Sequence, residues 1–493
     1  MTEIPHWLEK QYELQPSAVA VETSEDQKIT YEELRSQSRM MASGLINRGV
    51  SKGDHIAFLA DNHFNYAVFI HAVSYVGGIV VCLNTRLTPS ELAYQVVDAE
   101  ADYFVVDHHY AQLGKQTVDS SDLDLQIVSL EALPQTEKNN DLKETINFND
   151  RFTMMYTSGT TGSPKAVIHT YGNHWFSAVA SALNLGLSES DKWLVCLPLF
   201  HVGGFSLLMK NVIYGMPVVL LEKFDPSKVN RLIVERNISL ISVVTVMLQR
   251  ILEHKKGEYP VSFRGALLGG GPAPEPLLNK AFQFNIPVIQ TYGMTETSSQ
   301  ISTLRPQDAW RKLGSAGKAL SSASVKIVSD GKECSPYDIG EIHVKGPMVS
   351  IGYYHHEPHR EDYLSTGDLG YVDQDGFLFV VDRLKDMIIT GGENVYPAEI
   401  ESVLQEVEGI QEAAVTGMKH SEWGEVPAAF VVRKDNWSVT IEELRIYCMT
   451  RLAGYKVPVE FYFIEELPRN ASNKIVRRNL HSLIDKEGRN GDK

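Results

Sequence analysis

Hydroxyl-bearing residues, two glycines and a lysine stand close together from Tyr156 to Lys165, in the segment YTSGTTGSPK. Glycines let the backbone curl so that several N–H groups face one anion, while the hydroxyls add donors and the lysine adds positive charge. The G-x-x-x-x-G-K-[S/T] spacing of a Walker motif is absent. The segment therefore predicts a different type of triphosphate-binding loop, and the alternative is a flexible Ser/Gly connection.

Two further segments contain residues suited to a nucleotide or a metal ion. Leu268–Pro274 (LGGGPAP) has three glycines that permit close backbone approach to a flat ligand, although a plain turn would have the same composition. Thr291–Thr297 (TYGMTET) places Glu296 among threonines after a strand and a glycine turn. Oxygen ligands of this kind suit Mg²⁺, and the alternative for this segment is a helix cap.

Three segments in the second half of the chain contain charged residues in polar surroundings. Asp368 stands between glycines in STGDLGY, where its carboxylate could accept both hydroxyls of a ribose. Arg383 in DRLKD could bind ribose or phosphate, but such a run of charges is also typical of a solvated turn. Lys474 ends the polar segment LPRNASNK, and a lysine in such a loop usually lies on the surface.

Alternating helices and strands must position the early segments. Thr30 and Glu33 form a capping box, so a helix should begin there, and strands are expected over 56–60 and 101–107. A helix followed by a strand is expected over 65–83. Strands separated by helices predict a parallel sheet covered on both faces. The polar stretch 113–149 is expected to be surface structure that links two subdomains.

A second, smaller domain is predicted after Asp382. Pro397 should open a helix, strands are expected over 413–417, 428–432 and 460–464, and Thr440 with Glu443 forms another capping box. The charged tail after Asn479 is expected to fray. The fold class is therefore α/β, with a large multi-subdomain domain over 1–382, a hinge over 383–386 and a small α+β domain over 387–493.

Composition excludes several classes of protein. The formal net charge of −16 argues against general nucleic-acid binding, which needs a basic surface. Hydrophobic content of 43% and charged content of 22% are typical of a soluble globular chain without a membrane span. No secretory signal is apparent, which favours the cytoplasm. The four cysteines form no C-x-x-C pair, so reduced thiols are expected, and homo-oligomerisation is left open.

These six segments, in this order, resemble the adenylate-forming superfamily of acyl-CoA synthetases, firefly luciferases and peptide-synthetase adenylation domains. The resemblance implies that ATP with Mg²⁺ activates a carboxylic acid as an acyl-adenylate, and that coenzyme A then displaces AMP. It implies that a mobile C-terminal domain pivots at Lys385 between the two half-reactions, with Lys474 acting in the first. By the same resemblance, the phosphates are bound by Thr157, Ser158, Gly159, Thr160, Thr161, Gly162, Lys165 and Thr295, Mg²⁺ by Glu296, adenine by Gly270, Gly271, Pro272, Tyr292 and Gly293, ribose by Asp368 and Arg383, and the pantetheine arm by Gly391 and Gly392.

Three other segments resemble one branch of this superfamily, the o-succinylbenzoate–CoA ligases of bacterial menaquinone biosynthesis. They are YGNHWFSA from Tyr171, LPLFHVGG from Leu197 and KLGSAGK from Lys312. The segment PRNASNK also resembles this branch, although most of the superfamily has glycine where Asn473 stands.

The acid of this branch has a second, unreacted carboxylate, for which Lys210 in a mostly apolar run is the candidate partner; the alternative is a surface lysine. The resemblance implies that His201, Gly293, Ser298 and Ser299 line the acyl pocket. Rival functions are another aryl- or fatty-acyl-CoA ligase, a luciferase-type oxygenase, a peptide-synthetase module and a non-catalytic nucleotide-binding homologue.

Overall fold

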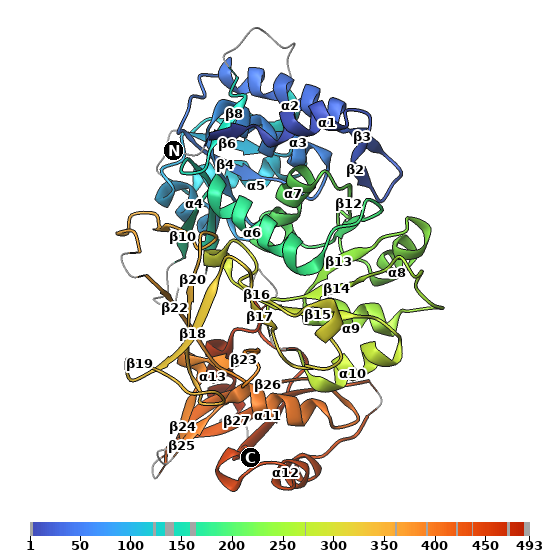
Figure 1. Ribbon diagram of the computed structural model, residues 1–493. Coiled ribbons are helices and arrows are strands. Elements are labelled where there is room, and N and C mark those ends of the chain that lie inside the picture. The colour runs from blue at the N-terminus through green and yellow to red at the C-terminus, as the bar shows by residue number, and fades with distance from the viewer. Residues whose placement is uncertain are drawn as a thin grey trace.

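A computed structural model of the chain describes residues 3–121, 125–133, 142–157, 164–271, 273–359, 362–390, 393–420, 423–435, 437–470 and 474–487. Two large sheets with their helices are built mainly from the first 320 residues, with one edge strand near residue 352, and two smaller sheets are formed by the later part of the chain (Figure 1). The strands β1 (Glu3–Pro5) and β8 (Thr145–Asn147) form a separate antiparallel pair.

The first large sheet has the strand order β21-β10-β9-β5-β4-β6-β7. Its five strands from β9 to β7 are parallel, because the helices α3 (Phe64–Val76), α4 (Pro89–Asp98) and α5 (Ala111–Asp119) provide the crossovers. Strand β10 then pairs antiparallel with β9. The strands are β21 (Gly352–Tyr353), β10 (Lys165–Thr170), β9 (Arg151–Thr157), β5 (Ile79–Cys82), β4 (His55–Leu59), β6 (Tyr103–Val106) and β7 (Ile127–Ser129).

The second large sheet has the order β17-β16-β15-β14-β13-β11-β12-β2-β3 and is parallel from β15 to β2. Its strands are β17 (Lys318–Ala319), β16 (Ser302–Thr303), β15 (Val288–Tyr292), β14 (Gly265–Leu268), β13 (Leu240–Val243), β11 (Trp193–Val195), β12 (Val218–Leu220), β2 (Val19–Thr23) and β3 (Lys28–Thr30). The helices α8 (Pro226–Glu235), α9 (Thr245–Glu253) and α10 (Glu275–Gln283) connect its central strands.

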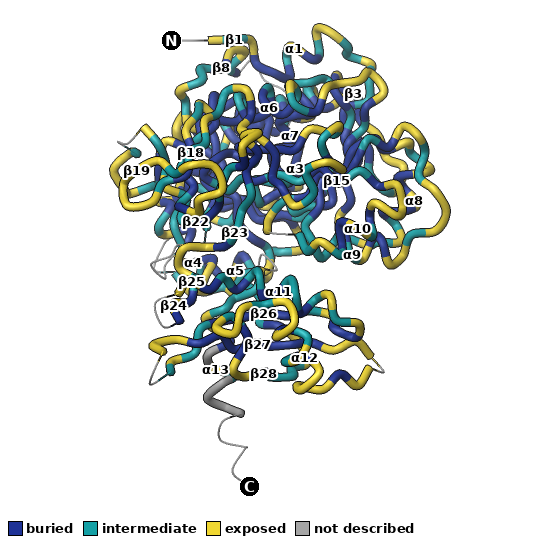
Figure 2. Tube along the Cα trace, turned by 60° about the horizontal axis from the view of Figure 1, so that its bottom comes forward, coloured by how far each residue is buried: buried dark blue, intermediate teal, exposed yellow. Residues whose placement is uncertain are grey.

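One hydrophobic core joins the two large sheets. Side chains from α2 (Tyr31–Ile46), α3 and α7 (Val202–Tyr214) pack in it against strands of both sheets, together with the start of α1 (Trp7–Leu14). Helix α6 (Tyr171–Leu185) contributes Tyr171 and Leu185. Figure 2 shows this buried interior in dark blue. Because the core spans both sheets, the strand ends of one sheet are held at fixed positions relative to those of the other.

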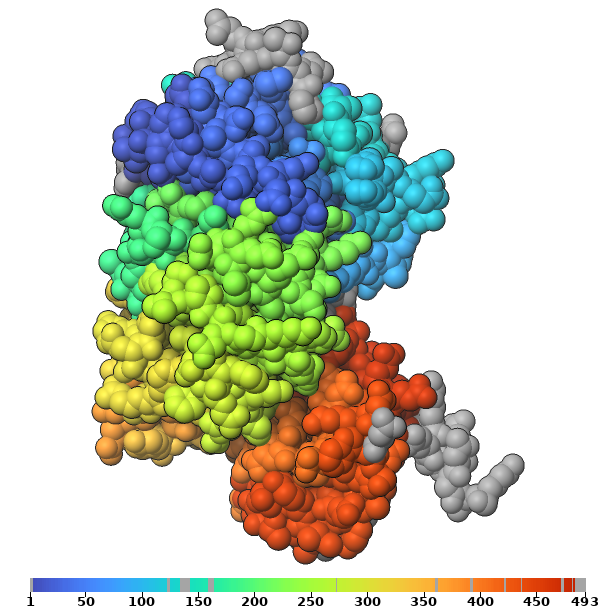
Figure 3. Space-filling model, turned by 90° about the vertical axis from the view of Figure 1, so that its right-hand side faces the viewer, coloured from blue at the N-terminus to red at the C-terminus, as the bar shows by residue number. Residues whose placement is uncertain are grey.

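The remaining two sheets are smaller. The first is antiparallel with the order β19-β18-β20-β22-β23, where β19 is Lys332–Glu333, β18 Ser324–Ser329, β20 Gly340–Lys345, β22 Leu364–Val372 and β23 Leu378–Arg383. The second consists of β25 (Glu393–Val395), β24 (Ile388–Thr390), β27 (Gly424–Arg433), β26 (Ile410–His420) and β28 (Glu460–Phe463). With α11 (Pro397–Gln405), α12 (Ile441–Met449) and α13 (Arg477–Glu487), the second sheet forms the orange and red lobe at the bottom of Figure 3.

Most elements agree with the sequence predictions. Both capping boxes are present, and Pro397 begins α11. The apolar stretch before Leu83 is helix α3 and strand β5, and none of the described helices is long and apolar enough to cross a membrane. All four cysteines are free thiols.

Two predictions are wrong. The stretch 113–149 contains β7, which is the edge strand of the first sheet and not part of a link. The tail after Asn479 continues α13 as far as Glu487, because Leu480 is buried against β27 residues in the second small core of the lobe.

Candidate active site

The phosphate-binding segment joins β9 to β10. Thr157 pairs with Lys165 across this hairpin, so the two ends of the segment lie side by side. Strand β21 adds to the free edge of β10 and brings Tyr353 under the lysine, with the Lys165 Nζ 5.4 Å from the ring centroid. The predicted ligands Ser158, Gly159, Thr160, Thr161 and Gly162 lie outside the described residues, as do Pro272, Gly391 and Gly392.

The Glu296 carboxylate contacts the same tyrosine as Lys165 does. The Tyr353 hydroxyl donates to Glu296 Oε1 at 2.8 Å, and Glu296 is only 5% exposed. Its backbone carbonyl accepts from the Ser350 N–H at 2.7 Å. This carboxylate is nearly buried, and among the described residues it forms no ion pair with a lysine or arginine. Such a carboxylate suits a hard divalent cation, so the donor set fits Mg²⁺.

Buried histidines hold the backbone of η3 (Thr295–Thr297), the short helix that contains Glu296. The His169 Nε2 lies 2.6 Å from the Thr295 carbonyl oxygen and must donate to it. Burial lowers the pKa of His169 to about 4, so the ring is neutral and its Nδ1 accepts from Thr153 Oγ1 at 3.2 Å. The same hydroxyl accepts from His174 Nε2 at 3.1 Å. The relay His174–Thr153–His169 thus ends on the carbonyl of Thr295.

Asp368, Arg383 and Tyr292 meet where two sheets face each other. Asp368 on β22 pairs in register with Arg383 on β23, and Asp368 Oδ1 lies 3.4 Å from Arg383 Nε. The Tyr292 hydroxyl donates to the other carboxylate oxygen at 2.8 Å. Burial raises the pKa of Asp368, while Arg383 and the tyrosine hydroxyl oppose that rise. The carboxylate is fixed in position, with lone pairs left for ribose hydroxyls.

Lys474 reaches this region from the C-terminal lobe. Its backbone N–H donates to Asn470 Oδ1 at 2.9 Å, and its carbonyl accepts from the Asn470 N–H, so Lys474 is held to Asn470. The residue keeps contact with solvent, but the surrounding protein removes enough hydration to lower the pKa of its ammonium group, and Arg383 adds to that effect. Asp368 and Glu296 act in the opposite direction. Lys474 therefore lies within electrostatic range of both the predicted ribose residues and the predicted Mg²⁺ ligand.

His201 occupies the N-cap position of α7, without a capping hydrogen bond from its side chain, in the same neighbourhood. Burial lowers its pKa to about 4, and the positive charges of Lys474 and Arg86 add to this, so the ring is neutral at pH 7. Its Nε2 is buried without a hydrogen-bond partner in the described part of the chain. The preceding loop is held by Asn62, which accepts from the Leu199 N–H and donates to the Leu197 carbonyl, both at 2.9 Å.

Lys210 is buried, so the alternative of a surface lysine is wrong. It is 1% exposed on α7, and its Nζ lies 4.9 Å from the centroid of the Trp193 ring. No ion pair or hydrogen bond of its ammonium group is found within the described ranges. Burial alone lowers its pKa to about 7. An unpaired buried cation is costly unless something compensates its charge.

The remaining predicted residues differ in what they contact. Gly293 has a structural reason to be glycine, because a Cβ there would lie 1.6 Å from the Ser299 carbonyl oxygen. Gly270 has a φ of +85° after β14, and Gly271 has open space around it. Ser298 is fully buried and donates to the Met348 carbonyl at 2.9 Å, so it holds the loop, whereas Ser299 is partly exposed.

The segment around Lys385 connects the β23 sheet to the lobe. Lys385 is exposed in η5 (Leu384–Asp386). Just before it, Asp382 Oδ2 accepts from the Ala398 N–H of α11 at 2.9 Å. Just after it, Asp386 pairs with Arg477 of α13 at 3.1 Å. Few contacts therefore determine how the lobe is oriented at this segment.

Tyr353, His169, Thr153 and Asn62 are site residues that the sequence prediction missed. Tyr353 becomes part of the site only because β21 pairs with β10, and local spacing contains no signal of that pairing. His169 offered a weak signal, since it is a polar residue directly after the apolar run 166–168 of β10. Asn62 acts from the end of β4, more than a hundred residues before the loop that it holds.

The chain matches two family models and several curated proteins. Residues 8–354 match the AMP-binding enzyme family, and residues 399–474 match the AMP-binding enzyme C-terminal domain. A 2-succinylbenzoate–CoA ligase from Geobacillus sp. (strain WCH70) is 47% identical over 98% of both chains. Another from Oceanobacillus iheyensis is 49% identical over 97% of this chain and 98% of its own.

Solved structures of the o-succinylbenzoate CoA synthetase from Bacillus subtilis are similar along the whole chain. Its complex with the acyl-adenylate intermediate is 44% identical in sequence and has a TM-score of 0.92. The match covers 97% of this chain and 98% of that one. At the same identity and coverage of this chain, the TM-score is 0.91 for the complex with ATP and magnesium ion, covered to 100%. A double mutant bound to a product analogue, covered to 98%, gives only 0.75 at the same identity. The chain therefore belongs to the AMP-binding enzymes and, within them, to the 2-succinylbenzoate–CoA ligase family.

Proposed function

We propose that this protein is an ATP-dependent ligase that joins o-succinylbenzoate to coenzyme A through an acyl-adenylate, as a step of menaquinone biosynthesis. In the first half-reaction a carboxylate oxygen of the acid attacks the α-phosphorus of ATP, and pyrophosphate leaves. In the second, the thiolate of CoA attacks the acyl carbon, and AMP leaves. The observation that supports this reaction best is the convergence of Lys474 with Glu296, Asp368 and Arg383.

The first half-reaction brings two anions together, so fixed cations and donors lower its barrier. Lys474 offsets the repulsion between the acid and the α-phosphate, and Thr295 donates to that phosphate. The segment from Thr157 to Lys165 binds the β- and γ-phosphates, and Lys165 contributes its positive charge. Mg²⁺ held by Glu296 neutralises charge on the triphosphate, and Tyr353 keeps that carboxylate oriented at 2.8 Å. Asp368 and Arg383 fix the ribose, and Tyr292 with Gly270 and Gly271 forms the adenine wall.

The second half-reaction requires Lys474 to leave. We infer a rotation of the lobe about Lys385, because only a few contacts of Asp382 and Asp386 connect the two sides of η5. The lower TM-score to the product-analogue complex than to the adenylate complex of the same enzyme, at equal coverage, supports two arrangements in this family. The described arrangement, with Lys474 near Glu296, corresponds to adenylation.

The second carboxylate of the acid explains the buried cation. Lys210 would receive the ring carboxylate, which does not react, while His201 and Ser299 border the chain that does. A neutral His201 suits a pocket wall, since its pKa of about 4 removes it from proton transfer at pH 7. A fatty-acid pocket would gain nothing from a buried ammonium group, so Lys210 favours this acid over the rival ligase functions.

The test is pyrophosphate release with Mg-ATP and CoA across o-succinylbenzoate, benzoate, 4-hydroxybenzoate, a medium-chain fatty acid and acetate. The proposal expects a strong preference for o-succinylbenzoate and its CoA thioester in the mass spectrum. Preference for a mono-acid would retain a ligase but refute the assigned substrate. Absence of turnover with every acid, despite ATP binding, would support the non-catalytic homologue.

A further inference from the structure

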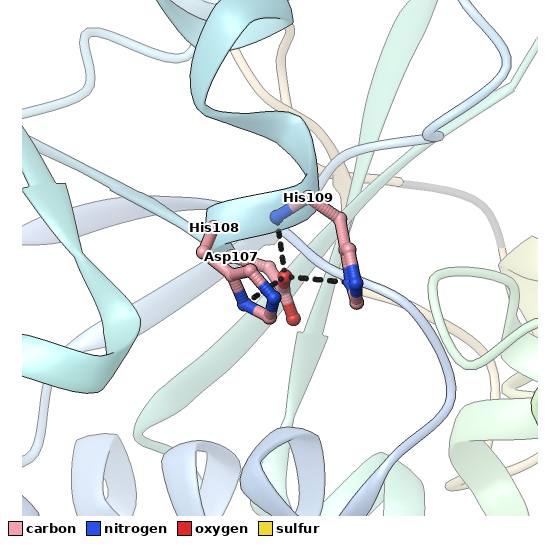
Figure 4. Close-up of side chains that lie close together, drawn as sticks. All are labelled: Asp107, His108 and His109. Carbon is pink, nitrogen blue, oxygen red and sulfur yellow. Dashed lines mark hydrogen bonds and ion pairs between the residues drawn. The ribbon is translucent and has the colours of Figure 1, made fainter.

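A second group of ligating side chains lies where β4 and β6 end, on elements other than those that hold Glu296. Asp107 follows β6 and is 1% exposed. The rings of His108 and His109 both face its carboxylate (Figure 4), and His63, which follows β4, contacts the same carboxylate. Across the described ranges, no lysine or arginine pairs with Asp107. The charged or ionisable side chains that contact this buried carboxylate, among the described residues, are thus all imidazoles.

The distances within this group match those around a metal ion. Asp107 Oδ1 lies 3.2 Å from His108 Nδ1 and 3.3 Å from His109 Nδ1. Neither contact has hydrogen-bond geometry; the hydrogen bond of His108 Nδ1 goes to Glu131 Oε1 at 2.9 Å. Bonds of about 2.0 Å in a tetrahedral zinc site separate neighbouring ligand atoms by about 3.3 Å. All three ligand atoms lie within 4.8 Å of one another, so one ion could contact them together.

We propose that Asp107 Oδ1, His108 Nδ1 and His109 Nδ1 bind a divalent transition-metal ion of the zinc type. Glu131 beside His108 supplies the second negative charge that neutralises such an ion. His63 holds the other carboxylate oxygen, as outer partners of metal ligands commonly do. Imidazole nitrogens favour Zn²⁺, Co²⁺ or Ni²⁺ over Mg²⁺. The site is therefore chemically distinct from the oxygen-rich site at Glu296.

Local backbone structure accounts for only part of this arrangement. Asp107 Oδ1 also accepts from the His109 N–H at 2.9 Å and so caps η1 (His108–Tyr110). That bond explains an aspartate at this position. It does not explain why two ring nitrogens converge on the capped oxygen, with the His109 ring making no hydrogen bond to the described residues.

The test is a titration of the metal-depleted full-length protein with Co²⁺, followed by its visible absorption. One Co²⁺ per chain should bind, with the intense bands of a tetrahedral site. His109→Gln changes an exposed side chain and should fold normally, yet weaken binding at least about tenfold through the loss of one ligand. His254→Gln, at an exposed histidine after α9, is the matched control and should bind as the wild type does. Both variants should keep Mg-ATP-dependent ligase activity.

Three results would overturn the metal site: no Co²⁺ or Zn²⁺ binding by the wild type, equal binding by His109→Gln, or displacement of the ion by excess Mg²⁺.

Discussion

Lys210 is the residue whose environment contrasts most strongly with its chemistry. It is an ammonium group with 1% exposure, and among the described residues it has only the Trp193 ring as an electrostatic partner. A substrate carboxylate would supply the missing negative charge. Its binding would then depend on the protonation state of this lysine. Two predictions follow from its burial, one on substrate choice and one on stability.

Lys210→Met should remove the preference for the acid with a ring carboxylate. The comparison uses o-succinylbenzoate and 4-oxo-4-phenylbutanoate, which lacks that group. Loss of a buried charge pair costs at least about 2 kcal/mol, or about 30-fold in kcat/KM, for the first acid only. Because the free lysine has a pKa of about 7, wild-type affinity for o-succinylbenzoate should fall as pH rises above 7, whereas Lys210→Arg should not titrate there. Equal losses for both acids would place Lys210 away from the ring carboxylate.

The same substitution should stabilise the ligand-free protein. The lysine pKa is about 7 in the folded protein against 10.5 ordinarily, so its charge opposes folding fully below pH 7 and progressively less up to pH 10.5. Lys210→Met should therefore raise the unfolding free energy by about 1–3 kcal/mol at pH 7 and by less at pH 10. Denaturant unfolding at both pH values measures this effect, with Lys115→Met in α5 as the exposed control. A lower unfolding free energy for Lys210→Met than for the wild type would contradict the claim that the charge of Lys210 is uncompensated.

At the scale of single elements, η3 depends on β10 for its position. The Thr295 carbonyl has the His169 ring as donor at 2.6 Å, and the residue after it is the predicted Mg²⁺ ligand. His169→Leu should weaken the apparent affinity for Mg²⁺ and for Mg-ATP about tenfold, because one buried hydrogen bond is lost. His169→Gln can both donate and accept, and should restore most of the activity. His71→Leu, at a buried histidine of α3 with no partner for its Nε2, is the matched control.

The readout for this prediction is the Mg²⁺ concentration at half-maximal rate, alongside thermal unfolding. A positioning role predicts a changed Mg²⁺ requirement with rescue by glutamine. If His169→Leu and His71→Leu lower stability equally and leave the Mg²⁺ requirement unchanged, the histidine is only a packing residue.

Elements and site residues differed in how far the sequence could predict them. Capping boxes and Pro397 marked helix starts because their signals are local. Strand β7 was missed because three residues, of which one is buried, leave too short a pattern. Lys165, Glu296 and Asp368 stood out through neighbouring glycines and hydroxyls. Tyr353 and Asn62 could not be predicted, since pairing and packing over long sequence separations bring them to the site.

At the scale of the whole molecule, the proposed mechanism requires that the orientation of the C-terminal lobe determines which half-reaction the site can perform. Lys385→Pro should restrict the backbone of η5, since proline fixes φ near −65° and removes an N–H. We expect adenylation to persist in this variant and thioester formation from the adenylate to fall by about tenfold or more, because rotation of the lobe is slowed. Stopped-flow measurement of each half-reaction distinguishes the two effects. Equal loss in both would indicate local damage to η5.

Lys474→Ala should give the opposite pattern, and its two half-reactions are the first measurement to make. The lysine interacts electrostatically with Glu296 and Asp368 in the described arrangement, and in the proposed first step it would offset charge between the acid and ATP. Pyrophosphate formation in a single turnover with o-succinylbenzoate should fall by about 100-fold or more. Conversion of preformed o-succinylbenzoyl-adenylate and CoA to the thioester should stay within about twofold of the wild type. Equal loss of both steps would contradict a lysine that acts in adenylation alone and then moves away with its lobe.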